Sequence, residues 1–196
     1  MTISQQTDFS YRRINVVGTS GSGKTTFGQR LAAILNLDFI QIDQIFWGPD
    51  WYLPTDAEFF PKLKQELTCR NSWVLDGNYA RTTPIKWENV EAVIWLDYSF
   101  IRTLYQALKR ALKRAITQEE IWPDTGNKES FKKSFFSRDS IILWTITTYG
   151  STRKKYNQCL TDPRYSHIRF IRFRSISESH TFLKHVSIAF GRTYEQ

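Results

Sequence analysis

The chain contains few cysteines, few histidines and no long hydrophobic run. Its two cysteines, Cys69 and Cys159, lie far apart, which favours free thiols in a reducing cytoplasm over a disulfide framework. Its three histidines are too few and wrongly spaced for a zinc site. No segment approaches the roughly 18 consecutive apolar residues of a membrane-spanning helix, and the polar first residues do not resemble a secretory signal. We therefore expect a cytoplasmic protein without a membrane partner.

The order of apolar runs predicts a single α/β domain over residues 1–196. This length suits one domain with its own hydrophobic core. Short apolar runs alternate with helix-like stretches, which is the rhythm of a parallel sheet whose strands are joined by helices. The predicted strands are residues 13–17, 39–42, 73–75, 92–96 and 168–173, and helices are predicted at residues 24–35 and 178–189.

The strongest local signal is the motif GTSGSGKT at residues 18–25, which matches the G-x-x-x-x-G-K-[ST] pattern of a phosphate-binding loop. It follows a predicted strand and opens a predicted helix. Glycines let backbone N–H groups approach phosphates closely, and the helix dipole points at the same oxygens. We expect Lys24 to reach the β- and γ-phosphates of ATP and the Thr25 hydroxyl to ligate Mg²⁺. The predicted nucleotide-binding residues are Gly18, Thr19, Ser20, Gly21, Ser22, Gly23, Lys24, Thr25 and Thr26.

Three aspartates follow predicted strands and are candidates for the magnesium shell, which in P-loop proteins includes a carboxylate from a neighbouring strand. Asp76 is the strongest, because it follows an apolar run and precedes a glycine that allows a sharp exit. Asp43 follows another strand and is placed to face the cleft from the other side. Asp97 precedes a predicted helix and is interpreted mainly as a turn or cap residue. We assign Thr25 and Asp76 to the metal.

Three segments resemble the DNA topology modulation protein family, which belongs to the adenylate-kinase-like P-loop group. They are the phosphate-binding loop, the stretch DQIFWGPDW at 43–51 and the stretch WVLDGNY at 73–79. The resemblance covers roughly residues 13–115. It implies a three-layer, adenylate-kinase-like fold with a mainly parallel five-stranded sheet, ATP binding and phosphotransfer. Adenylate kinases carry proline and then arginine after the Asp-Gly-aromatic run, whereas this chain reads NYAR at 78–81, which argues against adenosine monophosphate as the acceptor.

Two segments fit the strand–helix alternation poorly and are interpreted as insertions beside the nucleotide cleft. Residues 43–71 are assigned to acceptor binding and residues 115–137 to a lid. Trp47 and Trp51 flank a Gly-Pro turn in the first insertion, where they either stack on a planar ligand or close the hydrophobic core. Asn78 and Arg81, next to Asp76, are predicted to bind a hydroxyl or anionic group of the acceptor.

Residues 100–116 are predicted to form an amphipathic basic helix whose apolar stripe packs in the core. Docking of this helix on a membrane surface ranks lowest among the candidate functions, because the core needs the apolar stripe. Arg110 and Arg114 are four residues apart and share a face. The resemblance implies that they stand at the base of the lid and stabilise the phosphoryl group in flight, with a solvated helix face as the alternative. The apolar residues of the stripe are Ile101, Leu104, Leu108, Leu112 and Ala115.

Two functions of different classes remain open. The preferred one is a kinase that transfers the γ-phosphoryl group of ATP to a small molecule or nucleotide with Mg²⁺. Its catalytic residues would be Lys24, Arg110, Arg114 and Asp43. The alternative is an ATP-dependent regulator that acts on DNA topology or on a protein partner. The formal charge is +8, and residues 99–174 hold 16 Lys and Arg against 6 Asp and Glu, an uneven field that attracts polyanions such as nucleotides or DNA.

Overall fold

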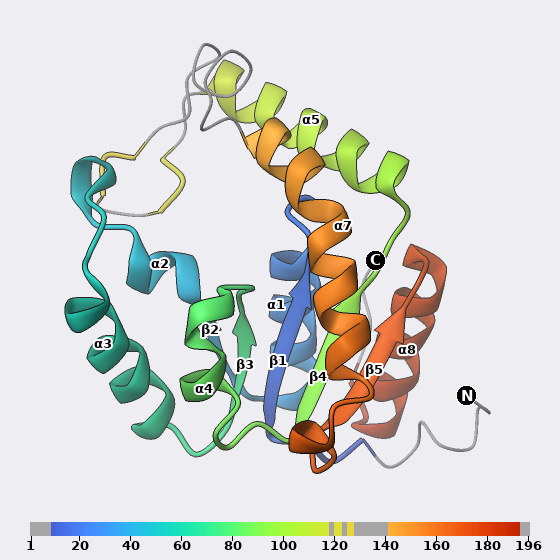
Figure 1. The fold of residues 1–196 in the computed structure, drawn as a ribbon. Coiled ribbons are helices and arrows are strands. Elements are labelled where there is room, and N and C mark those ends of the chain that lie inside the picture. The colour runs from blue at the N-terminus through green and yellow to red at the C-terminus, as the bar shows by residue number, and fades with distance from the viewer. Residues whose placement is uncertain (1–8, 118–119, 123–124, 128–140, 193–196) are drawn as a thin grey trace.

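A parallel β-sheet forms the centre of the protein (Figure 1). The computed structural model describes residues 9–117, 120–122, 125–127 and 141–192. The five strands lie in the order β2-β3-β1-β4-β5, and each neighbouring pair is parallel. The predicted α/β fold with a parallel five-stranded sheet is therefore confirmed. The strands are β1 (Arg13–Gly18), β2 (Asp38–Gln41), β3 (Trp73–Asp76), β4 (Ala92–Leu96) and β5 (Arg169–Phe173).

Helices cover both faces of the sheet and complete the predicted three layers (Figure 1). Strand β1 serves both cores because successive side chains of a strand point to opposite faces. Val16 is buried with Phe27 and Phe182 on one side, and Val17 is buried with Phe59 on the other. One face carries α1 (Lys24–Leu35) and α8 (Ile176–Ala189), and the other carries α3 (Asp56–Thr68), α4 (Thr83–Lys86) and α7 (Ile141–Cys159).

The strand order places a ligand-binding edge at the end of β1. The chain runs from β1 to the edge strand β2, returns through β3 and then crosses to β4 on the other side of β1. In open parallel sheets, ligands bind at the carboxyl ends of the strands where the direction of winding changes. Gly18, the last residue of β1, is also the first residue of the phosphate-binding loop. The predicted site therefore lies where this topology favours one.

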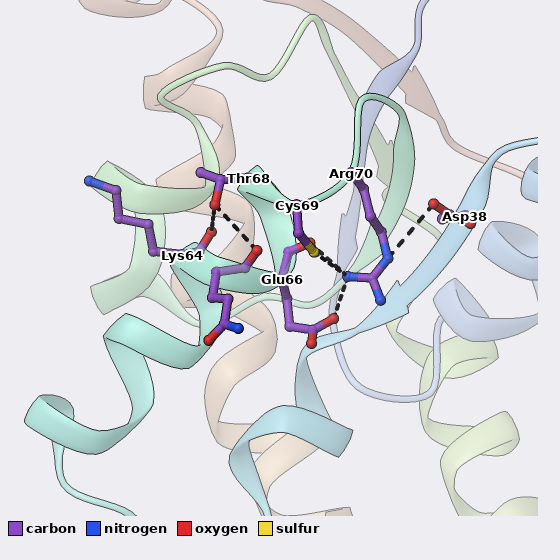
Figure 2. Close-up of polar contacts among 7 residues, drawn as sticks. Asp38, Lys64, Glu66, Thr68, Cys69 and Arg70 are labelled. Atoms are coloured by element: carbon purple, nitrogen blue, oxygen red, sulfur yellow. Dashed lines mark hydrogen bonds and ion pairs between the residues drawn. The ribbon is translucent and has the colours of Figure 1, made fainter.

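Helix α3 is held at both ends by side chains. At its start, Thr55 and Glu58 form a capping box, in which the Glu58 carboxylate accepts a hydrogen bond from the Thr55 N–H at 2.8 Å. After its end, Arg70 forms an ion pair with Glu66, and its Nε lies 3.7 Å from the Asp38 carboxylate on β2 (Figure 2). These contacts tie α3 to the edge strand of the sheet and so fix the far end of the predicted acceptor-binding insertion.

Helix α5 (Phe100–Thr117) crosses the carboxyl edge of the sheet, and the prediction that its apolar stripe packs in the core is wrong. The buried face instead consists of Thr103, Ala107 and Ala111, while Leu108 and Leu112 are exposed. A Cβ added to Gly21 would lie 2.7 Å from the Thr103 carbonyl oxygen and 3.0 Å from the Ala107 Cβ. The loop backbone therefore approaches α5 so closely that only small side chains fit between them.

The two predicted insertions differ in how much of each the structure describes. The first begins with α2 (Ile42–Phe46) and the short helix η2 (Pro49–Trp51), which precede α3. Of the second, residues 118–119, 123–124 and 128–137 lie outside the described residues. Both insertions stay predictions as functional units. Among the described residues, every helix is too short or too polar to cross a membrane.

Candidate nucleotide and acceptor site

The phosphate-binding loop has the backbone conformation that its glycines allow. Gly21 and Gly23 have φ values of 82° and 83°, in the left-handed region that residues with a Cβ rarely adopt. Gly23 is also the N-cap of α1, so the first N–H groups of that helix lack helical partners and are directed at the loop. Backbone N–H groups and a helix dipole that converge in this way form an anion-binding concavity, as the sequence predicts.

Lys24 points back into this concavity. Its ammonium group donates a hydrogen bond to the Thr19 carbonyl oxygen at 3.1 Å. Loss of hydration lowers the pKa of Lys24, while the nearby carboxylates of Asp76 and Asp43 oppose that effect and Arg110 adds to it. Charged side chains from three other parts of the chain, Asp43, Asp76 and Arg110, therefore act on the ammonium group of Lys24. The predicted catalytic residues Lys24, Asp43 and Arg110 lie in a single electrostatic neighbourhood together with Asp76.

Thr25 and Asp76 form the pair predicted to serve the metal. The Thr25 hydroxyl donates a hydrogen bond to the Asp76 Oδ2 at 2.6 Å, and Asp76 is buried at the end of β3. The second carboxylate oxygen, Oδ1, is buried without a hydrogen-bond partner. Burial raises the pKa of Asp76, against the opposing effects of Lys24 and Thr25. A hydroxyl and an unsatisfied buried carboxylate oxygen beside a phosphate cradle are the hard oxygen ligands that Mg²⁺ prefers, so these residues fit that ion.

Arg110, on α5, reaches the phosphate-binding loop. Its guanidinium donates a hydrogen bond to the Ser20 hydroxyl at 3.1 Å. Arg114 lies one turn further along α5 and is half-buried. Both arginines lie beside the buried face of α5 rather than on its exposed face. The placement of Arg110 agrees with a role at the phosphates, and the roles of both residues stay predictions.

Asp43 lies in the first turn of α2 and is held by Tyr79. The Tyr79 hydroxyl donates a hydrogen bond to the Asp43 Oδ1 at 2.8 Å and also interacts with the side chain of Trp47. Burial raises the pKa of Tyr79 well above its usual range, and the Asp43 charge adds to the effect. Tyr79 therefore stays a hydroxyl donor and orients the Asp43 carboxylate.

The two polar residues predicted to contact the acceptor already have protein partners. Asn78 accepts a hydrogen bond from the Tyr156 hydroxyl on α7. The Arg81 guanidinium lies 2.7 Å from the Asp56 carboxylate, and its central carbon lies 5.2 Å from the centre of the Phe46 ring. Both side chains therefore brace the segment that follows β3, and their roles toward an acceptor stay predictions.

Trp47 and Trp51 belong to an aromatic cluster that joins the two insertions. The ring of Trp47 stacks beside that of Trp122, with 6.0 Å between ring centres, and Trp51 meets both rings edge-on. The buried Asn127 completes the contact, because its side chain accepts a hydrogen bond from the Trp51 N–H at 2.7 Å and donates one to the Gly48 carbonyl at 2.9 Å. The sequence left open whether Trp47 and Trp51 stack on a planar ligand or close the hydrophobic core. This packing favours hydrophobic packing over ligand stacking, and the contact lies between the two insertions rather than in the central core.

Comparison with solved structures finds the same architecture in two shikimate kinases. The enzyme from Acinetobacter baumannii, in complex with shikimate, aligns with 95% of this chain and 97% of its own, at 17% identity and a TM-score of 0.54. The enzyme from Bacteroides thetaiotaomicron aligns with 93% of this chain and 99% of its own, at 14% identity and a TM-score of 0.50. The fold is that of a P-loop kinase. No protein-family model and no curated protein sequence matches the chain, so the resemblance to the DNA topology modulation family stays a prediction.

Two surface crevices lie at opposite edges of this P-loop kinase fold. One, of about 340 Å³, is lined by Arg102 at the start of α5 and by Arg174 after β5. Arg102 directly precedes Thr103, whose carbonyl oxygen lies close to Gly21 of the phosphate-binding loop. The larger crevice, of about 550 Å³, contains Arg13 at the amino-terminal end of β1 and so lies away from the loop. The smaller crevice therefore lies at the carboxyl edge of the sheet, the same edge as the phosphate-binding loop.

The sequence predicted that Asp97 is a turn or cap residue, whereas in this P-loop kinase fold it is the centre of a cluster of ion pairs. Its carboxylate is buried after β4 and forms ion pairs with Arg172 on β5 and with Arg153 on α7, the latter at 2.8 Å. The Arg172 guanidinium also lies 4.2 Å from the centre of the Trp95 ring. This cluster joins two strands and a helix beside the site.

Sequence reasoning missed three residues that structure brings to the site. Tyr79 was passed over although it stands between two residues that were selected, Asn78 and Arg81. Trp122 and Asn127 were overlooked because they lie in a polar segment without a periodic pattern, and nothing in the sequence indicates that this segment meets residues 47–51. A search for aromatic residues in both insertions would have found Trp122, whereas Asn127 carries no sequence signal.

Proposed function

We propose that this protein is a phosphotransferase that moves the γ-phosphoryl group of ATP to a hydroxyl group of a small-molecule acceptor. The observation that carries the proposal is the convergence of two carboxylates on Lys24. Asp76, bonded to Thr25, serves the metal side, and Asp43, bonded to Tyr79, serves the acceptor side. A second carboxylate, oriented by Tyr79, is placed to act on an attacking hydroxyl of an acceptor or of water, and the acceptor screen below distinguishes the two. Phosphoryl transfer between two oxygens uses such positioning and charge neutralisation rather than covalent catalysis.

The phosphate-binding loop, Lys24 and Arg110 would hold the triphosphate. The loop N–H groups bind the phosphate oxygens, and the two cations offset negative charge on the phosphoryl group as it leaves. Mg²⁺, when held by Thr25 and Asp76, supplies further charge neutralisation at the phosphates. The 340 Å³ crevice at the same edge of the sheet, lined by Arg102 and Arg174 among others, would receive the base and sugar of the nucleotide. In this arrangement α5 contributes Arg110 to the phosphates and Arg102 to the nucleotide crevice.

Asp43 would accept the proton of the acceptor hydroxyl as that oxygen attacks the γ-phosphorus. Tyr79 keeps its own proton and fixes the orientation of the carboxylate, so Asp43 presents its remaining lone pairs to the acceptor. The aromatic cluster of Trp47, Trp51 and Trp122 would exclude water from this side and so limit ATP hydrolysis. A small hydroxyl compound fits this chemistry, and shikimate, bound by one of the compared kinases, is the first compound to test.

The test is an acceptor screen with γ-labelled ATP, Mg²⁺ and a panel of hydroxyl compounds that includes shikimate, sugars and nucleosides. We expect transfer to at least one compound, lost in the Lys24→Ala variant. Slow ATP hydrolysis that no acceptor accelerates would contradict the proposal. A salt titration of DNA binding, run on the same preparation, tests the alternative regulator, because phosphate contacts make affinity fall steeply with salt.

A further inference from the structure

Helix α5 presents an apolar stripe to solvent. Its members recur at spacings of three and four residues, so they share one face of the helix. Their exposed fractions are large for side chains of this kind, from 37% at Leu108 to 79% at Ile101. Isolated exposed apolar residues are ordinary, but a contiguous row along a whole helix marks an interaction site. The stripe consists of Ile101, Tyr105, Leu108, Leu112 and Ile116.

The stripe is bordered on one side by cations. Arg102, Lys109 and Lys113 are exposed and follow one another along α5 at spacings of seven and four residues. At 100° per residue, they form a row directly beside the apolar one. Helix α5 contains no Asp or Glu, so no acidic side chain of the helix itself offsets this charge. Apolar and cationic rows side by side are the pattern of a helix that lies on an anionic interface.

The phosphate-binding loop fixes which face of α5 is outward. Gly21 packs against Thr103 and Ala107, and Arg110 donates to Ser20. A rotation of α5 that buried the stripe would break both contacts. The stripe is therefore a fixed outer surface of the protein in this arrangement, and Figure 1 shows α5 along the outer margin of the molecule above the sheet.

We propose that the outer face of α5 docks on the surface of an anionic lipid membrane. Apolar side chains enter the boundary between headgroups and acyl chains, and basic side chains pair with the headgroups. Nucleic acid fits less well, because phosphate contacts use cations and leave five apolar side chains without a partner. A second copy of the chain, packed symmetrically on this face, would bring Lys109 and Lys113 of both copies together and so repel. Lys109 and Lys113 take no part in the proposed kinase site, whereas Arg102 also lines the crevice assigned to the nucleotide.

The test is co-sedimentation of the full chain with vesicles of phosphatidylglycerol and phosphatidylcholine, compared with vesicles of phosphatidylcholine alone. We expect binding to the anionic vesicles that weakens as salt is added. The variants Leu108→Ser/Leu112→Ser and Lys109→Glu/Lys113→Glu should each lower the partition coefficient by more than about tenfold. Both variants should keep Mg-ATP binding, because their side chains point away from the loop.

Matched controls come from exposed residues elsewhere. Ile188→Ser on α8 removes an apolar side chain that is 65% exposed, and Lys62→Glu/Lys64→Glu on α3 reverses the same number of exposed charges. Neither control should change vesicle binding. Equal loss in the controls, or no binding to anionic vesicles at low salt, overturns the proposal. A dimer in light scattering that Leu108→Ser/Leu112→Ser abolishes, without vesicle binding, assigns the face to a second copy instead.

Discussion

The guanidinium of Arg110 donates a hydrogen bond to the hydroxyl of Ser20, 90 positions earlier in the chain, at 3.1 Å. This contact connects α5, which leads into the predicted lid, with the loop that would hold the phosphates. It places a permanent cation against the third residue of that loop. Gly21 of the loop packs on the same helix, against Thr103 and Ala107.

Replacement of Arg110 by alanine is expected to reduce phosphoryl transfer more than nucleotide binding. An arginine that stabilises the transferring group contributes about 10³–10⁵ in kcat, whereas ground-state contacts contribute less. The measurement is kcat and KM for ATP, with Lys109→Ala as the control because Lys109 is the exposed neighbour on the same helix. An equal loss in both variants would show that Arg110 acts only through general charge.

Replacement of Asp76 by asparagine is expected to stabilise the ligand-free protein and to weaken Mg-ATP binding by at least about tenfold. Burial raises the pKa of Asp76, so the carboxylate is held in a costly environment when no ligand is bound. Calorimetry with Mg-ATP and thermal unfolding without ligand measure the two effects. In the unchanged protein, Mg-ATP affinity should fall on acidification at a pH above the usual carboxyl range near 4. An unaltered Mg²⁺ dependence in Asp76→Asn would remove this residue from the metal site.

The Asp43→Asn variant should lose transfer to the acceptor by about 10²–10⁴ while binding Mg-ATP normally, since a general base acts on the acceptor proton. Tyr79→Phe keeps the carboxylate but removes the hydrogen bond that orients it. Its loss should therefore be smaller and confined to kcat. Parallel measurements of kcat and of ATP affinity distinguish these roles. A weakened ATP affinity in Asp43→Asn would contradict the assignment of Asp43 to the acceptor.

Removal of the Asn127 side chain should loosen the contact between the two insertions. Asn127→Ala leaves the Trp51 N–H and the Gly48 carbonyl without their partner, which costs about 1–3 kcal/mol when such groups stay buried. Hydrogen exchange at the amides of Gly48, Asp50 and Trp51 and the free energy of unfolding measure the change. Asn89→Ala, at an exposed asparagine, is the control. Unchanged exchange at residues 48–51 would contradict the bracing role.

Lys86 gives a prediction for stability against pH. It is fully buried, and burial lowers its pKa well below the ordinary value, with Lys155 adding to the effect. The folded protein then binds fewer protons than the unfolded chain between the two pKa values, so stability rises with pH up to about 10. Lys86→Met should raise the unfolding midpoint near neutral pH, with a gain that shrinks toward about pH 10. The control is the exposed Lys62→Met, and a loss of stability at every pH would mean that the Lys86 hydrogen bond to Gly77 outweighs burial.

Local patterns predicted much of the fold because each depends on neighbouring residues. Buried strands such as 92–96 are apolar throughout, and the glycines and lysine of residues 18–25 identify the phosphate-binding loop. The pairing of Thr25 with Asp76 followed from the phosphate-binding motif, which supplies the hydroxyl, and from a carboxylate at the end of a neighbouring strand. The helix at 100–116 was also predicted correctly, within one residue of α5.

The outward direction of the apolar stripe on α5 was decided by tertiary structure alone. A periodic pattern states that a helix has an apolar face but not what that face meets, and here the loop backbone requires small residues on the inner side. The partners of Asp97, Arg81 and Asn127 were likewise hidden, because each is set by how distant segments approach in space. The sequence by itself determined the phosphate-binding loop and the parallel sheet, since these are encoded by contiguous residues. The closure of the two insertions and the exposed face of α5 arise from contacts between residues far apart in the chain, which only folding brings together.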